Sequence, residues 1–371
     1  MQRGVVLRIV ALCYLSAFAS NYVQIAGLWG RDGILPVEVS LRQTFLGTQD
    51  KSLLQTPTIL IYSKEIADMI RPLLDFVGDV DTALYLLCLF GCFAALAAFV
   101  SERCCNSLTF LILWASYLSV FTVGQEFLSF QWDILLLEVG LIAVIYAPIP
   151  LLQGAEDLST ANILGREQVR WLSFRLLFSS GVVKLQAGCP TWWHLSALYY
   201  HFETQCLPNP LSWYFHQLPA YFLHLGVAFT YFAMIYCSWL FYSPLRMPRL
   251  LAVLVNIAMQ ALILVSGNYN FFNILTIGLV LSACDDEDFR RYRGLKWLRV
   301  ALGVKDYYVE QAKEEKTTWE IRLIRGKMIL STVLCVGIIG YIWTKYLPLD
   351  QILAGKLPFT ASDLRSIVSI T

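Results

Sequence analysis

Four histidines and one glutamate lie in one aromatic stretch, and their spacing raises the question of a metal site. The four histidines of the chain are His194, His201, His216 and His224. A continuous helix would present His194 and His201 on one face, with Glu203 nearby. Imidazole and carboxylate groups bind zinc, but the sequence contains neither an HExxH nor a CxxC pattern. We therefore favour aromatic residues of a membrane interface over a metal site, and we predict neither a metal nor a cofactor.

Charged residues inside apolar runs form a second set of candidates, because a charge in a membrane span is a functional candidate by default. Lys184 ends an apolar run, and we favour a helix-end lysine whose ammonium reaches the interface over a chemical role. Asp133 opens another apolar segment and can cap its helix. Glu138 lies deeper and needs a partner, for which Arg175 or Lys184 is suitable. A structural ion pair is favoured over proton transfer.

The stretch from Gly188 to Pro219 is rich in Trp, Tyr, His and Pro and contains neither Lys nor Arg. It lies between two apolar segments. Because cytoplasmic loops are enriched in Lys and Arg, we expect this loop on the lumenal side of a secretory membrane. Its two cysteines, Cys189 and Cys206, are a candidate disulfide pair in such an oxidising compartment, and the sequence alone leaves their pairing open.

The prolines and aromatic residues of this loop predict an ordered surface. Prolines fix the direction of the backbone, and aromatic side chains supply contact area with little loss of entropy. The surface either binds a client polypeptide or packs on the membrane domain, and the residue types favour neither. The candidate client-binding residues are Trp192, Trp193, Tyr199, Tyr200, Thr204, Gln205, Pro208 and Pro210.

A shorter polar break follows at Ser266–Asn273. Gly267 allows a tight turn, and Asn268 and Asn270 can satisfy backbone groups at membrane depth. We predict a lumenal turn between two spans, with a re-entrant turn that lines a ligand site as the alternative.

The composition sets the fold class. The chain of 371 residues is 57% apolar and 15% charged, with a mean hydropathy of +0.58. Soluble domains average about 25% charged residues, so this is an integral membrane protein of the all-α class, a polytopic transmembrane helical bundle with an aromatic lumenal loop. The net charge of +1 provides no field for nucleic acid, and we expect no nucleic-acid partner.

Hydropathy predicts about nine spans, with a range of roughly seven to nine because several are shorter than the ~20 residues of an isolated spanning helix. The weakest are 171–185 and 271–283, which are tilted, re-entrant or covered by neighbouring helices. The predicted spans are 5–28, 80–100, 108–123, 134–150, 171–185, 220–242, 250–265, 271–283 and 328–346.

The distribution of basic residues predicts a cytoplasmic N-terminus and a lumenal C-terminus. The predicted cytoplasmic loops carry Arg103, Arg166, Arg170, Arg246, Arg249 and the basic run from Arg290 to Lys327. The predicted organisation is a membrane core over 1–284 with lumenal loops at 30–79 and 186–219, a cytoplasmic amphipathic segment over 285–327, a further span over 328–346, and the interrupted start of a C-terminal region over 347–371.

Five blocks of the sequence resemble the lipase maturation factor family. They are Phe18–Pro36, Val123–Gly140, Trp171–Leu185, Cys189–Pro219 and Ser266–Asn273, in the family's order. The match extends over nearly all of residues 5–285, so it is far more specific than any single short motif.

The resemblance implies a multi-pass protein of the endoplasmic reticulum membrane that assists the maturation and secretion of client proteins, namely homodimeric lipases, by non-covalent lumenal binding. Membrane lipid is the other implied partner, and the oligomeric state stays open. Family members continue with a large lumenal domain, so we expect a truncated form here. The alternative is a membrane-embedded enzyme loosely similar to vitamin K-dependent carboxylases, which would use Lys184, Glu138 and the lumenal histidines.

Overall fold

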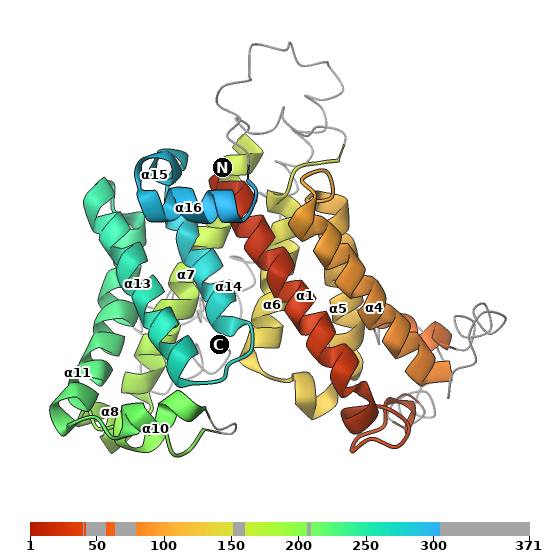
Figure 1. The fold of residues 1–371 in the computed structure, drawn as a ribbon, viewed down its shortest axis with the longest axis horizontal. Coiled ribbons are helices and arrows are strands. Elements are labelled where there is room, and N and C mark those ends of the chain that lie inside the picture. The colour runs from red at the N-terminus through yellow and green to blue at the C-terminus, as the bar shows by residue number, and fades with distance from the viewer. Residues whose placement is uncertain (40, 42–56, 64–78, 151–159, 206–208, 305–371) are drawn as a thin grey trace, which may run out of the picture. The chain divides into compact units, whose positions relative to one another are not determined.

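The computed structural model describes residues 1–39, 41, 57–63, 79–150, 160–205 and 209–304, in which every regular element is a helix (Figure 1). The predicted all-α class is therefore confirmed for this part of the chain. The chain divides into two compact units, and each is described by itself. The first contains Arg3–Gly154 and Trp297–Tyr307, and the second contains Ala155–Lys296.

Four long helices make up the first unit. They are α1 (Gln2–Leu28), α4 (Asp79–Val100), α5 (Ser107–Val123) and α6 (Gln131–Tyr146), accompanied by the short 3-10 helices η1 (Ile59–Tyr62) and η2 (Gln125–Leu128). Apolar residues run almost without interruption along α1, which supplies the fully buried side chains of Tyr14, Phe18 and Ile25. Because α1 is apolar nearly all round, burial among the other helices suits its sequence.

The centre of the first unit holds a buried polar contact. The hydroxyl of Tyr117 on α5 donates to Oδ1 of Asp133 on α6 over 2.5 Å, and both residues are buried. The rings of Tyr14 and Phe18 pack against Tyr117, with centroid distances of 5.8 and 5.5 Å. The prediction that Asp133 caps its helix is wrong, because α6 begins earlier, with Phe130 as its N-cap residue. The carboxylate instead links two neighbouring helices.

The second unit contains three longer helices, α7, α11 and α13, and a series of short ones. Its elements are α7 (Thr160–Gln186), α8 (Pro190–Trp193), α9 (Leu198–His201), α10 (Pro210–His216), α11 (Ala220–Tyr231), the π-turn η3 (Phe232–Tyr236), α12 (Cys237–Trp239), η4 (Leu240–Tyr242), α13 (Arg246–Ser266), α14 (Phe272–Val280), η5 (Leu281–Ala283) and α15 (Asp286–Arg291). Within this unit, α8 and α10 lie at one end of α13 and α15 lies at the other (Figure 1). The amphipathic helix α16 (Arg293–Ala301) follows in the chain.

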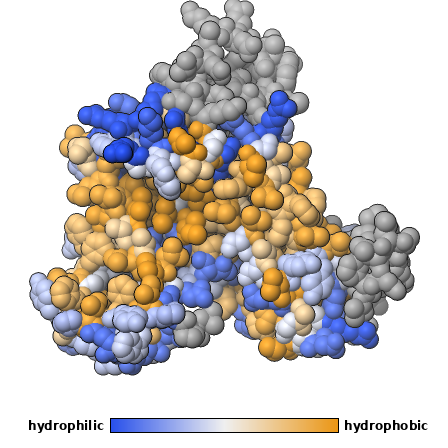
Figure 2. All heavy atoms as spheres, in the orientation of Figure 1, coloured by the Kyte–Doolittle hydropathy of each residue, from blue (hydrophilic) through white to orange (hydrophobic). Residues whose placement is uncertain are grey.

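Among the described residues, four helices are long and apolar enough to cross a membrane: Gln2–Leu28, Val80–Val100, Ala220–Tyr242 and Arg246–Ser266. Two shorter apolar helices cover Ser107–Val123 and Phe272–Ala283. Over α11 and α13, apolar side chains form a band between the polar residues near α15 and the mixed surface near α8 and α10 (Figure 2). This pattern is typical of helices that span a bilayer. The predicted span 328–346 lies outside the described residues.

Two helix boundaries differ from the hydropathy prediction. The helix predicted over 134–150 ends at Tyr146, and Ala147 is already extended. Pro148 explains this end, because the residue before a proline is disfavoured in helical conformation. The weak span 171–185 is the second half of α7, whose first half carries Arg166, Glu167 and Arg170 and was therefore missed by hydropathy.

Candidate functional site

One end of the second unit exposes an unusual number of aromatic side chains. We define the aromatic surface as the six large aromatic residues of the helices α8 to α11 that are 57–67% exposed: Trp193, Tyr200, Trp213, Tyr214, Tyr221 and Phe222. Two pairs of these rings contact each other directly, Trp213 with Tyr214 at a centroid distance of 5.1 Å and Tyr221 with Phe222 at 5.8 Å. Trp213, Tyr214, Tyr221 and Phe222 were absent from the predicted client-binding set. Each pair of adjacent aromatic residues follows a proline closely in the sequence, and this was an available signal.

Local sequence explains why this region forms short helices. Pro190 and Pro210 occupy the beginnings of α8 and α10, where a missing N–H costs nothing. The side chain of Asn209 caps α10 by accepting from the backbone N–H of Leu211 over 2.9 Å. Leu195 has a positive φ of 56°, which separates α8 from α9. The interpretation that His194 and His201 share a helical face is therefore wrong.

Polar side chains fasten the loop to the turn between α13 and α14. Gln205 donates through Nε2 to the carbonyl of Ser266 over 3.0 Å, and the hydroxyl of Ser212 donates to the same carbonyl. Asn209 donates to the carbonyl of Gly267 over 3.4 Å. Gln205 was predicted to contact a client, but here its amide holds the loop in place.

The conformation of the turn itself differs from the prediction. Gly267 is extended, with φ of −147°, and the left-handed residue is Asn270, with φ of 52°. A Cβ at position 267 would lie 2.4 Å from the ring of Tyr269, so a larger residue there would have to displace that ring. Asn268 and Asn270 are both exposed.

Lys184 joins three elements near the loop. Its ammonium donates to the carbonyl of Ser180 on α7 over 2.8 Å, contacts Sδ of Met234 on the π-turn at 3.6 Å, and lies 5.3 Å from the ring centroid of Trp192 on α8. The hydroxyl of Tyr231 on α11 donates to the backbone carbonyl of Trp192 over 3.4 Å. Trp192 is thus half-buried, and its contacts hold α8, which carries Trp193 of the aromatic surface.

Three of the four histidines contact neighbouring groups in or beside the loop. His201 Nε2 lies 3.2 Å from the hydroxyl of Tyr269, and His216 Nε2 lies 2.8 Å from Glu203. The two ring nitrogens of His224 face the hydroxyl of Tyr199 at 3.4 Å and the carbonyl of Leu195 at 3.0 Å. These contacts stabilise the loop conformation, so the chemistry that this end offers is binding through exposed rings.

The predicted site residues divide into four groups. Trp193, Tyr200, Thr204 and Pro210 are exposed, and Trp192, Tyr199 and Gln205 are partly buried among the contacts above. Cys206 and Pro208 lie outside the described residues, so the disulfide with Cys189 stays a prediction. Glu138 on α6 and Arg175 on α7 are half-buried in different units, and their pairing stays a prediction as well.

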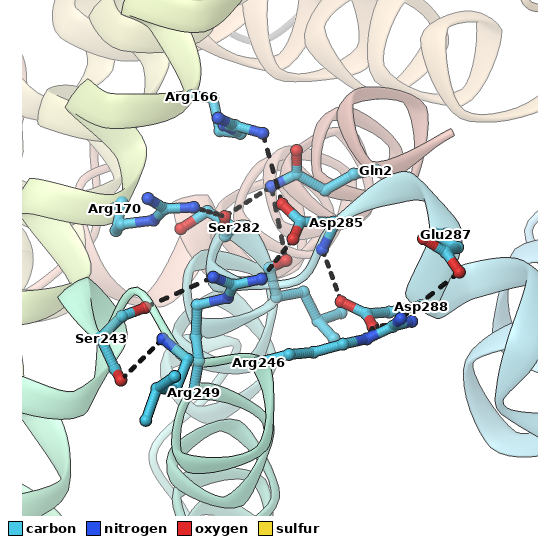
Figure 3. Close-up of polar contacts among 12 residues, drawn as sticks. Gln2, Arg166, Arg170, Ser243, Arg246, Arg249, Ser282, Asp285, Glu287 and Asp288 are labelled. Carbon is cyan, nitrogen blue, oxygen red and sulfur yellow. Dashed lines mark hydrogen bonds and ion pairs between the residues drawn. The ribbon is translucent and has the colours of Figure 1, made fainter.

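Arginines and carboxylates meet at the opposite end of the second unit (Figure 3). Asp288 is fully buried, and its Oδ1 accepts from Nε and Nη2 of Arg246 over 2.7 and 2.6 Å. Its Oδ2 accepts from the backbone N–H of Asp285 over 2.7 Å. Arg249 pairs with the carboxylate of Asp285, which also lies 3.5 Å from Arg166 on α7.

This arginine–carboxylate cluster, made of Arg166, Arg170, Arg246, Arg249, Asp285, Glu287 and Asp288, links α7, α13 and α15. The sequence prediction used its arginines only to orient the protein in the membrane. The spacing of Asp285 and Asp288 was an available signal, because acidic residues three apart before a short helix are typical of a capping box.

Comparison with known proteins identifies relatives of the whole described region. The model of the lipase maturation factor transmembrane domain matches residues 1–291. The chain is 44% identical over 284 residues to lipase maturation factor 2 of Xenopus laevis, which covers 76% of this chain and 39% of that protein. It is 38% identical over 367 residues to lipase maturation factor 2 of Mus musculus, covering 95% and 48% of the two chains.

Similarity to lipase maturation factor 1 is lower, at 30% identity over 291 residues for the Homo sapiens protein, with coverage of 77% of this chain and 48% of that one. The chain therefore spans about half the length of the curated relatives it matches, or less. No solved structure matches it.

Replacing Asp288 by Ala should destabilise the protein by roughly 1–3 kcal/mol, because the backbone N–H of Asp285 loses its buried acceptor and Arg246 loses its shortest ion pair. Glu287→Ala is the matched control, since that carboxylate is 70% exposed and makes one contact of 3.4 Å with Arg246. It should cost less than about 1 kcal/mol. Thermal unfolding in detergent measures both, and equal shifts would contradict the assigned role of Asp288.

Lys184→Met should loosen the loop without unfolding the helices. The cation–π contact with Trp192 is worth roughly 1–2 kcal/mol in a desolvated setting, so its loss should speed chymotrypsin cleavage within 188–219 by about tenfold. Lys184→Arg keeps the charge and serves as the control. Unchanged cleavage of the Met variant would show that the ammonium does not hold the loop.

The loop should also respond to acid through His201. Burial and the positive charge of Lys184 lower the pKa of His201 from its ordinary value of 6.5. The neutral form therefore contributes stability that is present above the ordinary pKa and is lost as the pH falls through the lowered pKa of the folded loop. His201→Gln should reduce the acid-induced rise in hydrogen exchange of the loop, whereas His194→Gln, at an exposed position, should leave it unchanged.

Proposed function

Because the chain belongs to the lipase maturation factor family, we propose that it is an endoplasmic reticulum membrane factor that assists the maturation and secretion of homodimeric lipases. It acts by binding partly folded client chains at its lumenal surface. This role requires no catalytic group or cofactor. The relatives are named for lipase maturation, and the single feature of this chain that carries the proposal is the aromatic surface.

An exposed aromatic cluster is suited to such clients. Partly folded chains expose apolar segments that aggregate unless they are covered. Aromatic side chains supply large contact areas at little entropic cost and are enriched in binding hot spots. Tryptophan and tyrosine side chains that remain about 60% exposed in the folded unit, such as Trp193, Trp213 and Tyr214, are available for this contact.

The proposed topology has about nine spans, with the N-terminus in the cytoplasm and the C-terminus in the lumen. The charge distribution of the second unit supports this orientation. Residues 185–245 contain neither Lys nor Arg, whereas the opposite end of the unit carries the arginine–carboxylate cluster. In this arrangement 1–284 is the membrane core, 285–327 is cytoplasmic, 328–346 crosses the membrane and 347–371 enters the lumen. The predicted loop 186–219 then faces the clients.

A secretion assay tests the proposal. The chain is expressed in cells that lack lipase maturation factors, and both the co-precipitated lipase and the secreted lipase activity are measured. We expect the chain to co-precipitate a homodimeric lipase, and we expect the double variant Trp213→Ser, Tyr214→Ser to lose at least about 80% of that binding, since hot spots dominate such interfaces.

Trp297→Ser is the matched control, because Trp297 on α16 is 71% exposed but lies outside the aromatic surface. Equal binding by the double variant and the control would show that the aromatic surface is not the contact site. Failure of the unaltered chain to bind any lipase would overturn the proposed function itself.

A further inference from the structure

We propose that the aromatic surface prefers client segments that carry Lys or Arg among apolar residues. This inference rests on the proposed client-binding function and specifies the chemistry of the bound segment. It follows from the scarcity of charged residues around the exposed rings, because the rest of the chain contains many more Lys, Arg, Asp and Glu residues.

The whole region from residue 185 to residue 245 contains one charged residue, Glu203, and no Lys or Arg. Its carboxylate is 62% exposed beside His216. The nearest lysine in the chain, Lys184, is directed toward Ser180, Met234 and Trp192. A basic client segment therefore meets no opposing cation from this stretch.

The exposed rings supply the attraction. Faces of Trp and Tyr carry negative electrostatic potential, and a cation near a ring face is stabilised by roughly 0.5–1 kcal/mol at exposed sites. Trp213 and Tyr214 lie edge to face, with ring planes at 87°, so the two rings present faces in different directions. A lysine or arginine can contact either ring while its apolar neighbours cover the rest of the surface.

Acidic segments are disfavoured by the same features. A carboxylate is repelled by the ring faces and by Glu203, and this stretch has no lysine or arginine to receive it. Apolar area alone would bind basic and acidic segments equally. The preference for basic segments thus separates this inference from general hydrophobic binding.

The experiment measures binding of three fluorescent peptides to the full chain in phosphatidylcholine nanodiscs. The peptides share one apolar sequence and differ at two positions, which are Lys, Gln or Asp. We expect the Lys peptide to bind about fivefold more tightly than the Asp peptide, with the Gln peptide between them. Empty nanodiscs control for binding to lipid.

Two paired variants show whether the rings cause the preference. Trp213→Leu, Tyr214→Leu keeps apolar area but removes two of the ring faces, and it should bring the affinities of the three peptides closer together. Trp213→Phe, Tyr214→Phe keeps aromatic faces and should retain the order Lys, Gln, Asp.

The other outcomes are informative as well. Equal binding of the three peptides by the unaltered chain would overturn this inference and leave the proposed function standing. Tighter binding of the Asp peptide than of the Lys peptide would also overturn this inference and leave the proposed function standing. Binding of the peptides in detergent but not in nanodiscs would show that lipid headgroups cover the rings, and would overturn both. Absence of binding in either medium would overturn the proposed function.

Discussion

An ammonium at the end of an apolar helical segment must be satisfied by groups close to it. The contacts that Lys184 makes for this reason organise the aromatic end of the second unit. Its three contacts come from α7, the π-turn η3 and α8. The π-turn matters here, because the extra residue in its turn changes the register of the helix and brings Met234 toward α7. Gly181 allows the close approach, since a Cβ there would lie 2.6 Å from Ile235. Trp192 is held in this contact, and the loop 188–219 that contains it is therefore attached to α7 and the π-turn.

The two ends of the second unit are stabilised by different kinds of contact. At the end with α15, charges are numerous but paired. The buried carboxylate of Asp288 joins α15 to α13 through Arg246 and caps α15 through the backbone N–H of Asp285. At the other end, charges are nearly absent, and the loop is held by amides, hydroxyls and ring contacts to the turn after α13. Because these contacts are made by neutral groups, they add no strong electrostatic field at the aromatic surface. The exposed rings then determine what can bind there.

Much of this arrangement follows from sequence. Apolar runs located the helices because burial in lipid requires them, and the prolines of 188–219 indicated an ordered loop. Other features depend on residues that meet only in the folded chain. The left-handed conformations of Leu195 and Asn270, the placement of Gln205 as a tether and the pairing of Arg246 with Asp288 have no periodic signal. The sequence also did not predict which side chains are exposed. Trp192 and Trp193 are neighbours in sequence, but only Trp193 is exposed.

Site-specific photocrosslinking tests the central claim most directly. A photoreactive amino acid replaces Trp213, on the aromatic surface, or Leu254, which is apolar and 64% exposed on α13. The experiment is done in cells that synthesise a homodimeric lipase. The account predicts crosslinks from position 213 to newly made lipase and crosslinks from position 254 to lipid alone. Lipid crosslinks from both positions, with no lipase at 213, would contradict it.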